Sequence, residues 1–189
     1  MPVENEYKFA LYDPEGTLEE KLMASDYFRA NIRQGYIRKG ARIREWHDLQ
    51  TNTVRYIFTY KHRVEDDVIE VETDISEDDF KKLWSIRELE VSKVRFKFIV
   101  DEFTWDVDFL KDQNNTYFSL AEVELPADER TVPVPPSTLK DYVLGGTGRH
   151  DKTLSNKRLL NVEYAKRVVT AFQAGEEAIK ELVLPKATT

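Results

Sequence analysis

Charged and apolar residues alternate through most of the first two thirds of the chain. The segment VENEYKF (3–9) has a charge at every second position, and Tyr7 and Phe9 lie between the charges. Because neighbouring side chains of a strand point to opposite faces, this pattern predicts a strand with one charged and one apolar face. Similar patterns predict strands at 3–11, 31–38, 41–49, 53–62, 66–75, 89–100, 102–111 and 116–126.

Helical patterns are fewer and lie between or after these strands. They predict helices at 17–29, at 76–87, near 137–143 and over 156–183, the last broken at Gly175. Thr17 and Ser76 are the expected N-caps of the first two helices. The segment TVPVPPS (131–137) marks a boundary or rigid connector, and GGTGRHDKTLSN (145–156) is expected to be a loop.

Short connections join the predicted strands, which favours antiparallel neighbours. Eight antiparallel strands with few helices predict a mainly β fold of the α+β class, built on a closed or nearly closed eight-stranded barrel. We expect one domain over residues 1–189. The barrel would occupy about 1–126, and a C-terminal loop and helices would occupy 131–189.

Alternation within each strand gathers charged residues on one face. The acids are Glu4, Glu6, Glu70, Glu72, Asp106, Asp108, Glu122 and Glu124, and the bases are Lys8, Arg42, Arg44, Arg55, Lys61, Lys93, Arg95 and Lys97. For any single strand, an ordinary solvated face is the simpler explanation. The repeated like-charged pairs instead favour a sheet curled with its charged face inward and its apolar face covered by the helices. That arrangement reverses the usual small barrel.

Charges gathered inside a protein cost several kcal/mol per ion unless they are paired or bind a ligand. A polyanion bound together with divalent cations would pair with both the bases and the acids of this face. Carboxylates bind Mg²⁺ or Mn²⁺, and arginine and lysine bind phosphate oxygens. The residues therefore predict a barrel-like domain whose interior suits a metal–phosphate ligand.

Composition narrows the classes of partner. The net charge of −7 disfavours general binding to nucleic acid or to an anionic membrane. The absence of cysteine excludes disulfides and thiolate metal sites. No apolar run is long enough for a membrane span, and the first residues lack the apolar region of a secretory signal. We expect a cytoplasmic protein, monomer or homodimer, whose partner is a small molecule.

At these charged positions the sequence resembles the CYTH family, also called the triphosphate tunnel metalloenzymes. The opening E-x-E-x-K signature of that family stands at 4–8. Its later landmarks follow in order as QGYI (34–37), RIR (42–44), TYK (59–61), EVE (70–72), KVR (93–95), DVDFL (106–110) and AEVEL (121–125). The similarity covers roughly residues 1–160.

The resemblance implies an eight-stranded antiparallel tunnel that binds a triphosphate with Mg²⁺ or Mn²⁺. It implies metal binding by Glu4, Glu6, Glu122 and Glu124, with Asp108, Glu70 and Glu72 as further candidates. It implies phosphate binding by Lys8, Arg42, Arg44, Lys61, Lys93 and Arg95, and Arg55 on the same face is a further candidate. Catalysis is expected to depend on Glu4, Glu6, Lys8 and Arg44.

Hydrolysis of a triphosphate, most simply inorganic tripolyphosphate, is the expected activity. The sequence offers no clear platform for a nucleobase, because Trp46 and Tyr36 are more simply explained by packing. Within the family, class IV-type adenylate cyclase activity and thiamine triphosphate hydrolysis are the alternatives. A non-catalytic polyphosphate-binding module is an alternative of a different class, and the intact acidic pairs favour turnover over it.

Overall fold

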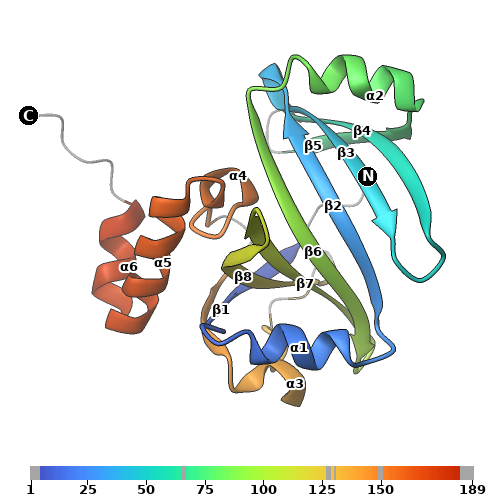
Figure 1. Cartoon of the computed structure of the whole chain (residues 1–189). Coiled ribbons are helices and arrows are strands. Elements are labelled where there is room, and N and C mark those ends of the chain that lie inside the picture. The colour runs from blue at the N-terminus through green and yellow to red at the C-terminus, as the bar shows by residue number, and fades with distance from the viewer. Residues whose placement is uncertain (1–4, 65–66, 127–128, 130, 149–150, 184–189) are drawn as a thin grey trace, which may run out of the picture.

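The computed structural model describes residues 5–64, 67–126, 129, 131–148 and 151–183 (Figure 1). Its strands are β1 (Glu6–Leu11), β2 (Phe28–Tyr36), β3 (Ala41–Asp48), β4 (Thr53–Val64), β5 (Asp67–Asp74), β6 (Leu89–Val100), β7 (Phe103–Asp112), β8 (Asn115–Glu124) and β9 (Val143–Thr147). Its helices are α1 (Thr17–Met23), α2 (Glu77–Trp84), α3 (Ser137–Lys140), α4 (Asn156–Leu159), α5 (Val162–Ala174) and α6 (Glu176–Val183), with a 3₁₀ turn at Arg38–Gly40.

All eight predicted strands are present, within a few residues of the expected ends. Ser76 is confirmed as the N-cap of α2, since its hydroxyl accepts the backbone N–H of Asp79. The expected cap of α1 is wrong. Gly16 holds that position, and the Asp13 carboxylate accepts the backbone N–H of Leu18 at 3.1 Å.

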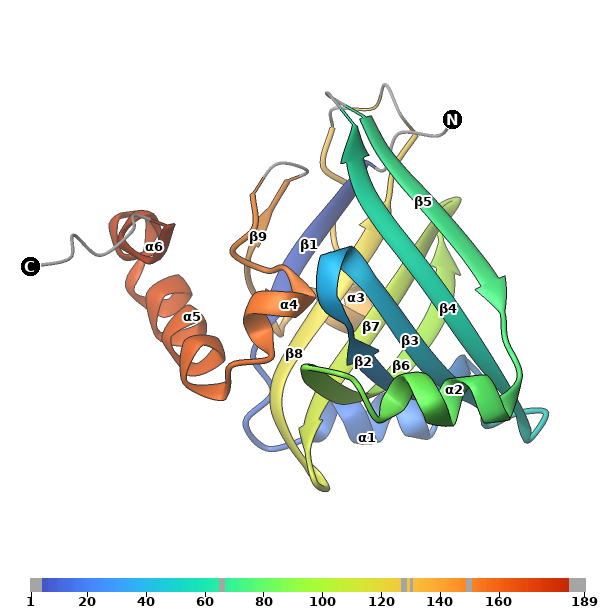
Figure 2. The same cartoon turned by 90° about the horizontal axis from the view of Figure 1, so that it is seen from above.

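The strands form one antiparallel sheet in the order β5-β4-β3-β2-β6-β7-β8-β1-β9. β9 overlaps the end of the helix expected near 137–143 and the start of the loop expected at 145–156, and it pairs with β1 on the edge opposite to β8. Both edges of β1 are therefore occupied. In the described part of the chain β5 pairs only with β4, so the expected closed eight-stranded barrel is corrected to a curled, open nine-stranded sheet (Figure 2).

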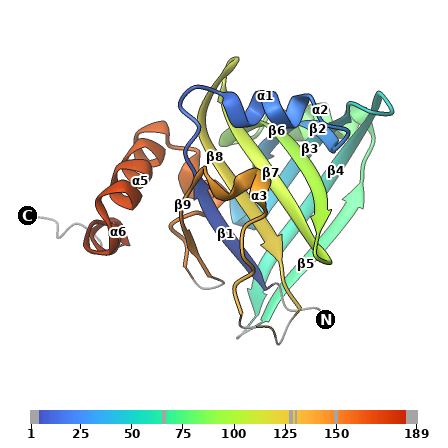
Figure 3. The same cartoon turned by 90° about the horizontal axis from the view of Figure 1, so that it is seen from below.

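The apolar face of the sheet points outward and is covered by helices. Trp105, Val107 and Phe109 of β7 are at most 1% exposed in a cluster that also contains Leu18 of α1 and Leu139 of α3. Figure 3 shows both helices lying across the strands that carry this cluster. α2 packs on β3 and β4, where Phe80 contacts Tyr56 with a centroid distance of 4.9 Å. The inside-out orientation is thus confirmed for the strands that carry this cluster, whereas on β2 it is reversed: Ala30 and Ile32 are buried on the inner side, and Asn31 and Arg33 are exposed on the outer side.

The C-terminal helices occupy a different place from the one expected. Three helices replace the predicted long helix, with the break at Gly175 confirmed and Asn161 capping α5. Residues of α4 and α5 pack with Ala10, Leu110 and Leu120, which share the face of the charged residues. The expectation that this segment covers the outer face is corrected, because the apolar ends of these strands require a cover on the inner side.

Candidate functional site

Strand register assembles the charged residues on the inner face of the sheet. Lys8 of β1 stands opposite Glu122 of β8, and Glu122 stands opposite Asp106 of β7. On the other side of the face, Lys61 of β4 stands opposite Glu70 of β5. Opposed residues of neighbouring strands lie about 5 Å apart and point to the same side of the sheet. The charged face predicted from alternation therefore exists on β1 and on β3 to β8, and it is interrupted on β2, whose residues on this side are uncharged.

A dense ion-pair network lies on β6, β7, β8 and β1. The Arg95 guanidinium donates to both carboxylate oxygens of Asp108 at 2.6 Å, and it also reaches Asp106 at 2.6 Å and Glu122 at 3.0 Å. Lys93 donates to Asp108 at 2.6 Å. The Lys8 ammonium forms ion pairs with both Glu122 and Glu6, and its Nζ atom lies 3.0 Å from the Glu6 carboxylate. We call these residues the central network.

A second group of cations lies on β3 and β4. The Arg44 guanidinium donates to the Gln34 amide oxygen at 2.8 Å and to Glu72 at 3.1 Å. Arg42 donates to Glu70 at 2.5 Å, and Lys61 lies 3.4 Å from the same carboxylate. The Nε atom of Arg42 is buried without a hydrogen-bond partner among the described residues. The Arg42 guanidinium therefore has one donor that the described residues around it do not satisfy.

The pKa values follow from burial and from these neighbours. Although burial raises the pKa of Asp108, the Arg95 and Lys93 charges outweigh it and hold that pKa well below its usual range. Burial and the adjacent Arg95 charge lower the pKa of Lys93 to about 8. Burial, together with the nearby Arg42 charge, also lowers the pKa of Arg44. The cations of this face crowd one another, which favours binding of an anion.

The acids expected to bind metal are only partly gathered. Glu6 and Glu124 stand opposite each other in register, with Glu122 two residues along β8, while Glu4 lies outside the described residues. Among the described residues, no group of three or more acidic or histidine side chains forms a metal-binding arrangement. Glu122 and Asp108 are instead bound by bases. Glu122 has a lowered pKa because Lys8 and Arg95 outweigh its burial.

The remaining predicted site residues lie around these two groups. Arg55 is on the inner face but is 60% exposed, and it pairs with Asp74 at 2.9 Å instead of joining the cations of β3. Sequence reasoning missed Gln34 and Asn156. Gln34 is buried on this face, in the landmark QGYI, but it shares its side of β2 with Ala30 and Ile32, so period-two alternation would have placed it on the apolar side. Asn156, 3.4 Å from Glu122, comes from a distant segment and carries no such signal.

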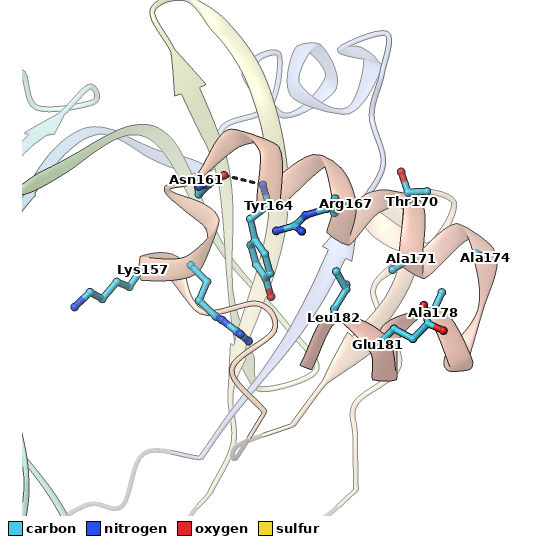
Figure 4. A pocket seen from close by; sticks show the side chains of 11 residues that line it. Lys157, Asn161, Tyr164, Arg167, Thr170, Ala171, Ala174, Ala178, Glu181 and Leu182 are labelled. Carbon is cyan, nitrogen blue, oxygen red and sulfur yellow. Dashed lines mark hydrogen bonds between the residues drawn. The ribbon is translucent and has the colours of Figure 1, made fainter. Parts of the chain in front are cut away.

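A surface pocket of about 810 Å³ lies apart from the charged face, between α4, α5 and α6 (Figure 4). Arg158 and Arg167 stand 5.1 and 5.8 Å from the centroid of the Tyr164 ring, and the Tyr164 hydroxyl donates to the Thr153 carbonyl. These contacts join α5 to the segment that precedes α4. The pocket therefore has a structural explanation, and the inner face of the sheet is the stronger candidate site.

Comparison with known proteins gives weak similarity only. No family model and no curated protein matches the chain. A protein from Pyrococcus horikoshii is 11% identical, covering 67% of this chain and 80% of its own, with a TM-score of 0.43. A "conserved hypothetical protein" from Pyrococcus furiosus is 14% identical over 97% of this chain and 92% of its own, with a TM-score of 0.41. A "putative adenylate cyclase" from Bacillus halodurans is 13% identical over 66% of this chain and 81% of its own, with a TM-score of 0.42.

Similarity this distant does not assign the chain to a family or give it an activity. Independently of these comparisons, no helix among the described residues has the length and apolarity needed to cross a membrane.

Proposed function

We propose that the inner face binds a triphosphate and that the protein hydrolyses it with Mg²⁺ or Mn²⁺, as the resemblance to the CYTH family implies. The observation that carries this proposal is the group of cations on β3 and β4, where Arg42, whose Nε has no hydrogen-bond partner among the described residues, shares Glu70 with Lys61 and lies near Arg44. Arginine forks suit bidentate contacts to phosphate oxygens.

Binding would proceed by exchange of ion partners. Without a ligand, the bases of the face are neutralised by its own acids, as in the pairs of Arg42 with Glu70 and of Lys8 with Glu122. A triphosphate would take over these bases, and the released carboxylates would then be free to bind a cation. The bases and the acids of the inner face would therefore contact the same ligand, a metal-bound polyanion.

Glu6, Glu122 and Glu124 would hold the metal, with Glu4 as a further ligand outside the described residues. Carboxylate oxygens are the ligands that Mg²⁺ prefers, but these acids would have to leave their bases first, since the described residues do not form a metal-binding group as they stand. When bound, the metal would neutralise phosphate charge and orient water. The chain's own part is to position the phosphates with Lys8, Arg42, Arg44 and Lys61 and to stabilise the charge that develops on the leaving phosphate.

A substrate panel tests this proposal. Tripolyphosphate, ATP and thiamine triphosphate are incubated with Mg²⁺ or Mn²⁺, and both orthophosphate and cyclic AMP are measured. Orthophosphate release supports hydrolysis, cyclic AMP indicates the cyclase alternative, and tight binding without either product indicates a non-catalytic module. Formation of cyclic AMP without hydrolysis, or tight binding without either product, would overturn the proposed hydrolysis.

Substitutions sharpen the test. Glu6→Gln and Arg44→Ala are each expected to lower turnover about 10²-fold or more, since each removes a charge-stabilising group. Arg38→Ala is the control, because Arg38 is 84% exposed and pairs with Glu88 away from the inner face. Near-parental rates in both site variants would show that the inner face is not the catalytic site.

A further inference from the structure

The pocket between α4, α5 and α6 carries positive charge as well as apolar surface (Figure 4). Lys157 and Arg158 of α4 and Arg167 of α5 line it, against a single acid, Glu181 of α6. The contacts of α5 with the segment before α4 explain the shape of this pocket. They do not explain why cations outnumber acids in its lining.

The two arginines of the pocket have no counter-charge among the described residues. Neither guanidinium forms a hydrogen bond or an ion pair with a described side chain or carbonyl group. Glu163 lies one turn before Arg167 on α5, but its carboxylate binds Lys166 at 2.8 Å instead. The N–H donors of Arg158 and Arg167 are therefore available to a ligand.

The Tyr164 ring fixes the place of both arginines. This ring is buried, and the tyrosine is held at both ends: its hydroxyl donates to the Thr153 carbonyl at 3.1 Å, and its backbone N–H donates to the Asn161 side chain at 2.8 Å. The guanidinium carbons of Arg158 and Arg167 lie within cation–π distance of its centroid, at 5.1 and 5.8 Å. A cation–π contact uses none of the N–H donors of a guanidinium, so these can bind the oxygens of an anion.

The rest of the pocket is largely apolar. Ala171 and Ala174 of α5 face Ala178 and Leu182 of α6 across it. Because alanine side chains are short, the two helices leave a hollow between them. The volume of about 810 Å³ lies in the range of small-molecule sites, roughly 300–1,000 Å³, which also combine apolar walls with a few polar groups.

From this geometry we infer that the pocket binds a small organic anion. Its charged head contacts Arg158 and Arg167, and its apolar part lies on the alanines of α5 and α6. An acyl carboxylate and an alkyl phosphate share this chemistry, with charge at one end only. The site is separate from the inner face of the sheet, so the inference does not rest on the proposed function.

Calorimetric titrations of the full chain with hexanoate, octanoate and octyl phosphate test the inference. Each added methylene that reaches the alanine wall is expected to lower the dissociation constant by up to roughly fourfold, from about 0.8 kcal/mol per buried methylene. Octanoate should therefore bind more tightly than hexanoate. Comparison of octanoate with octyl phosphate shows which head group the arginines prefer.

Two variants test the two ends of the pocket. Arg158→Gln combined with Arg167→Gln is expected to weaken octanoate binding roughly tenfold or more, because two charge-assisted hydrogen bonds are lost. Ala174→Leu keeps a strong helix former and fills the apolar end. It is expected to reduce the advantage of octanoate over hexanoate. Far-UV circular dichroism checks that these variants keep their helices.

Lys166→Gln is the matched control for charge. It removes a cation from α5 beside Arg167, but Lys166 is 63% exposed and is absent from the pocket lining. Arg44→Ala is the control for location, because it removes a cation of the inner face. Octanoate is expected to bind both variants with the affinity of the unmutated protein.

Length-dependent binding that is lost in the double arginine variant and kept in both controls supports the inference. Absence of binding by octanoate and by octyl phosphate overturns it, as does parental affinity in the double arginine variant. Equal affinity for hexanoate and octanoate overturns the apolar contact and with it the class of ligand. Loss of binding in Arg44→Ala would place the ligand on the inner face and overturn the assignment to this pocket.

Discussion

Individual charges on the inner face have unequal roles, and Asp108 and Lys93 show the difference. Asp108 is fully buried and accepts two hydrogen bonds from Arg95. Its carboxylate therefore forms a bidentate ion pair with the guanidinium. Lys93 is an additional cation beside the same acid, and the Arg95 charge opposes it. Burial and the Arg95 charge lower the pKa of Lys93, whereas the pKa of Asp108 is lowered because the Arg95 and Lys93 charges outweigh its burial.

Substitution should separate these two residues. Asp108→Asn is expected to lower the free energy of unfolding by roughly 3–5 kcal/mol, because it leaves two buried cations without their main counter-charge. Lys93→Met is expected to lower it by less than about 1 kcal/mol, since Asp108 keeps its Arg95 partner. Urea unfolding measures both. An equal loss in the two variants would contradict the assigned roles.

The lowered pKa of Lys93 also predicts a pH dependence. In the unfolded chain this lysine holds its proton up to about pH 10.4, whereas in the folded protein it releases it near pH 8. Between these values the unfolded state binds more protons, so the stability contributed by Lys93 rises with pH. Lys8 has a raised pKa, so its contribution persists through this window.

The measurement is the difference in unfolding free energy between the parent protein and Lys93→Met at pH 7.5 and at pH 10. We expect the parent to gain roughly 2 kcal/mol relative to the variant across that interval, from 1.36 kcal/mol per pKa unit. A constant difference would show that Lys93 titrates normally in the folded protein.

At the scale of elements, β9 adds a ninth strand to the sheet on the edge of β1. β9 contains two adjacent glycines, Gly145 and Gly146. Their lack of side chains lets the Phe172 and Tyr7 rings approach the β9 backbone closely. A Cβ atom on Gly146 would overlap the Tyr7 ring and lie 2.9 Å from the Lys8 carbonyl oxygen, and one on Gly145 would lie 2.7 Å from the Phe172 ring. Small residues at these positions let β9 pair with β1 while α5 packs against it.

Gly146→Ala tests the role of β9. The added methyl group is expected to lower the free energy of unfolding by about 1–3 kcal/mol through overpacking. It should also speed hydrogen exchange of the β1–β9 amides. Gly148→Ala is the control, since its Cβ would meet the Tyr7 ring at an ordinary 3.7 Å. Equal stability of the two variants would contradict the close packing of β9.

At the scale of the whole molecule, the sheet separates two kinds of surface. Its outer face buries aromatic and aliphatic side chains under α1, α2 and α3, while its inner face holds acids and bases in mutual contact. Such a face is stable without a ligand because its charges are paired. If the proposed function holds, a polyanion would bind at the expense of those pairs.

Ligand binding should therefore stabilise the whole fold. With Mg²⁺ and tripolyphosphate at 100 times its dissociation constant, the free energy of unfolding is expected to rise by about 2.7 kcal/mol. Thermal unfolding over a series of ligand concentrations measures this rise. In Arg44→Ala the same concentrations should give a smaller shift, because part of the phosphate site is lost. An identical shift in both proteins would place the ligand elsewhere.

The sequence by itself determined the strands and the composition of their faces. Period-two alternation is a local property, so it identified the side shared by Lys8, Arg44 and Glu122 before any pairing was known. The Ser76 cap and the break at Gly175 are likewise local signals. The α1 cap was predicted wrongly because Asp13 reaches the helix from outside its first turn.

Only the tertiary structure decided how those faces meet. The sheet gains a ninth strand because β9, from a segment more than 130 residues away, pairs with β1. The place of α4 and α5, the pairing of acids with bases, and the stacking of Phe28 on Trp46 all join residues distant in sequence. Such contacts depend on register and curvature, which alternation along a single strand does not specify.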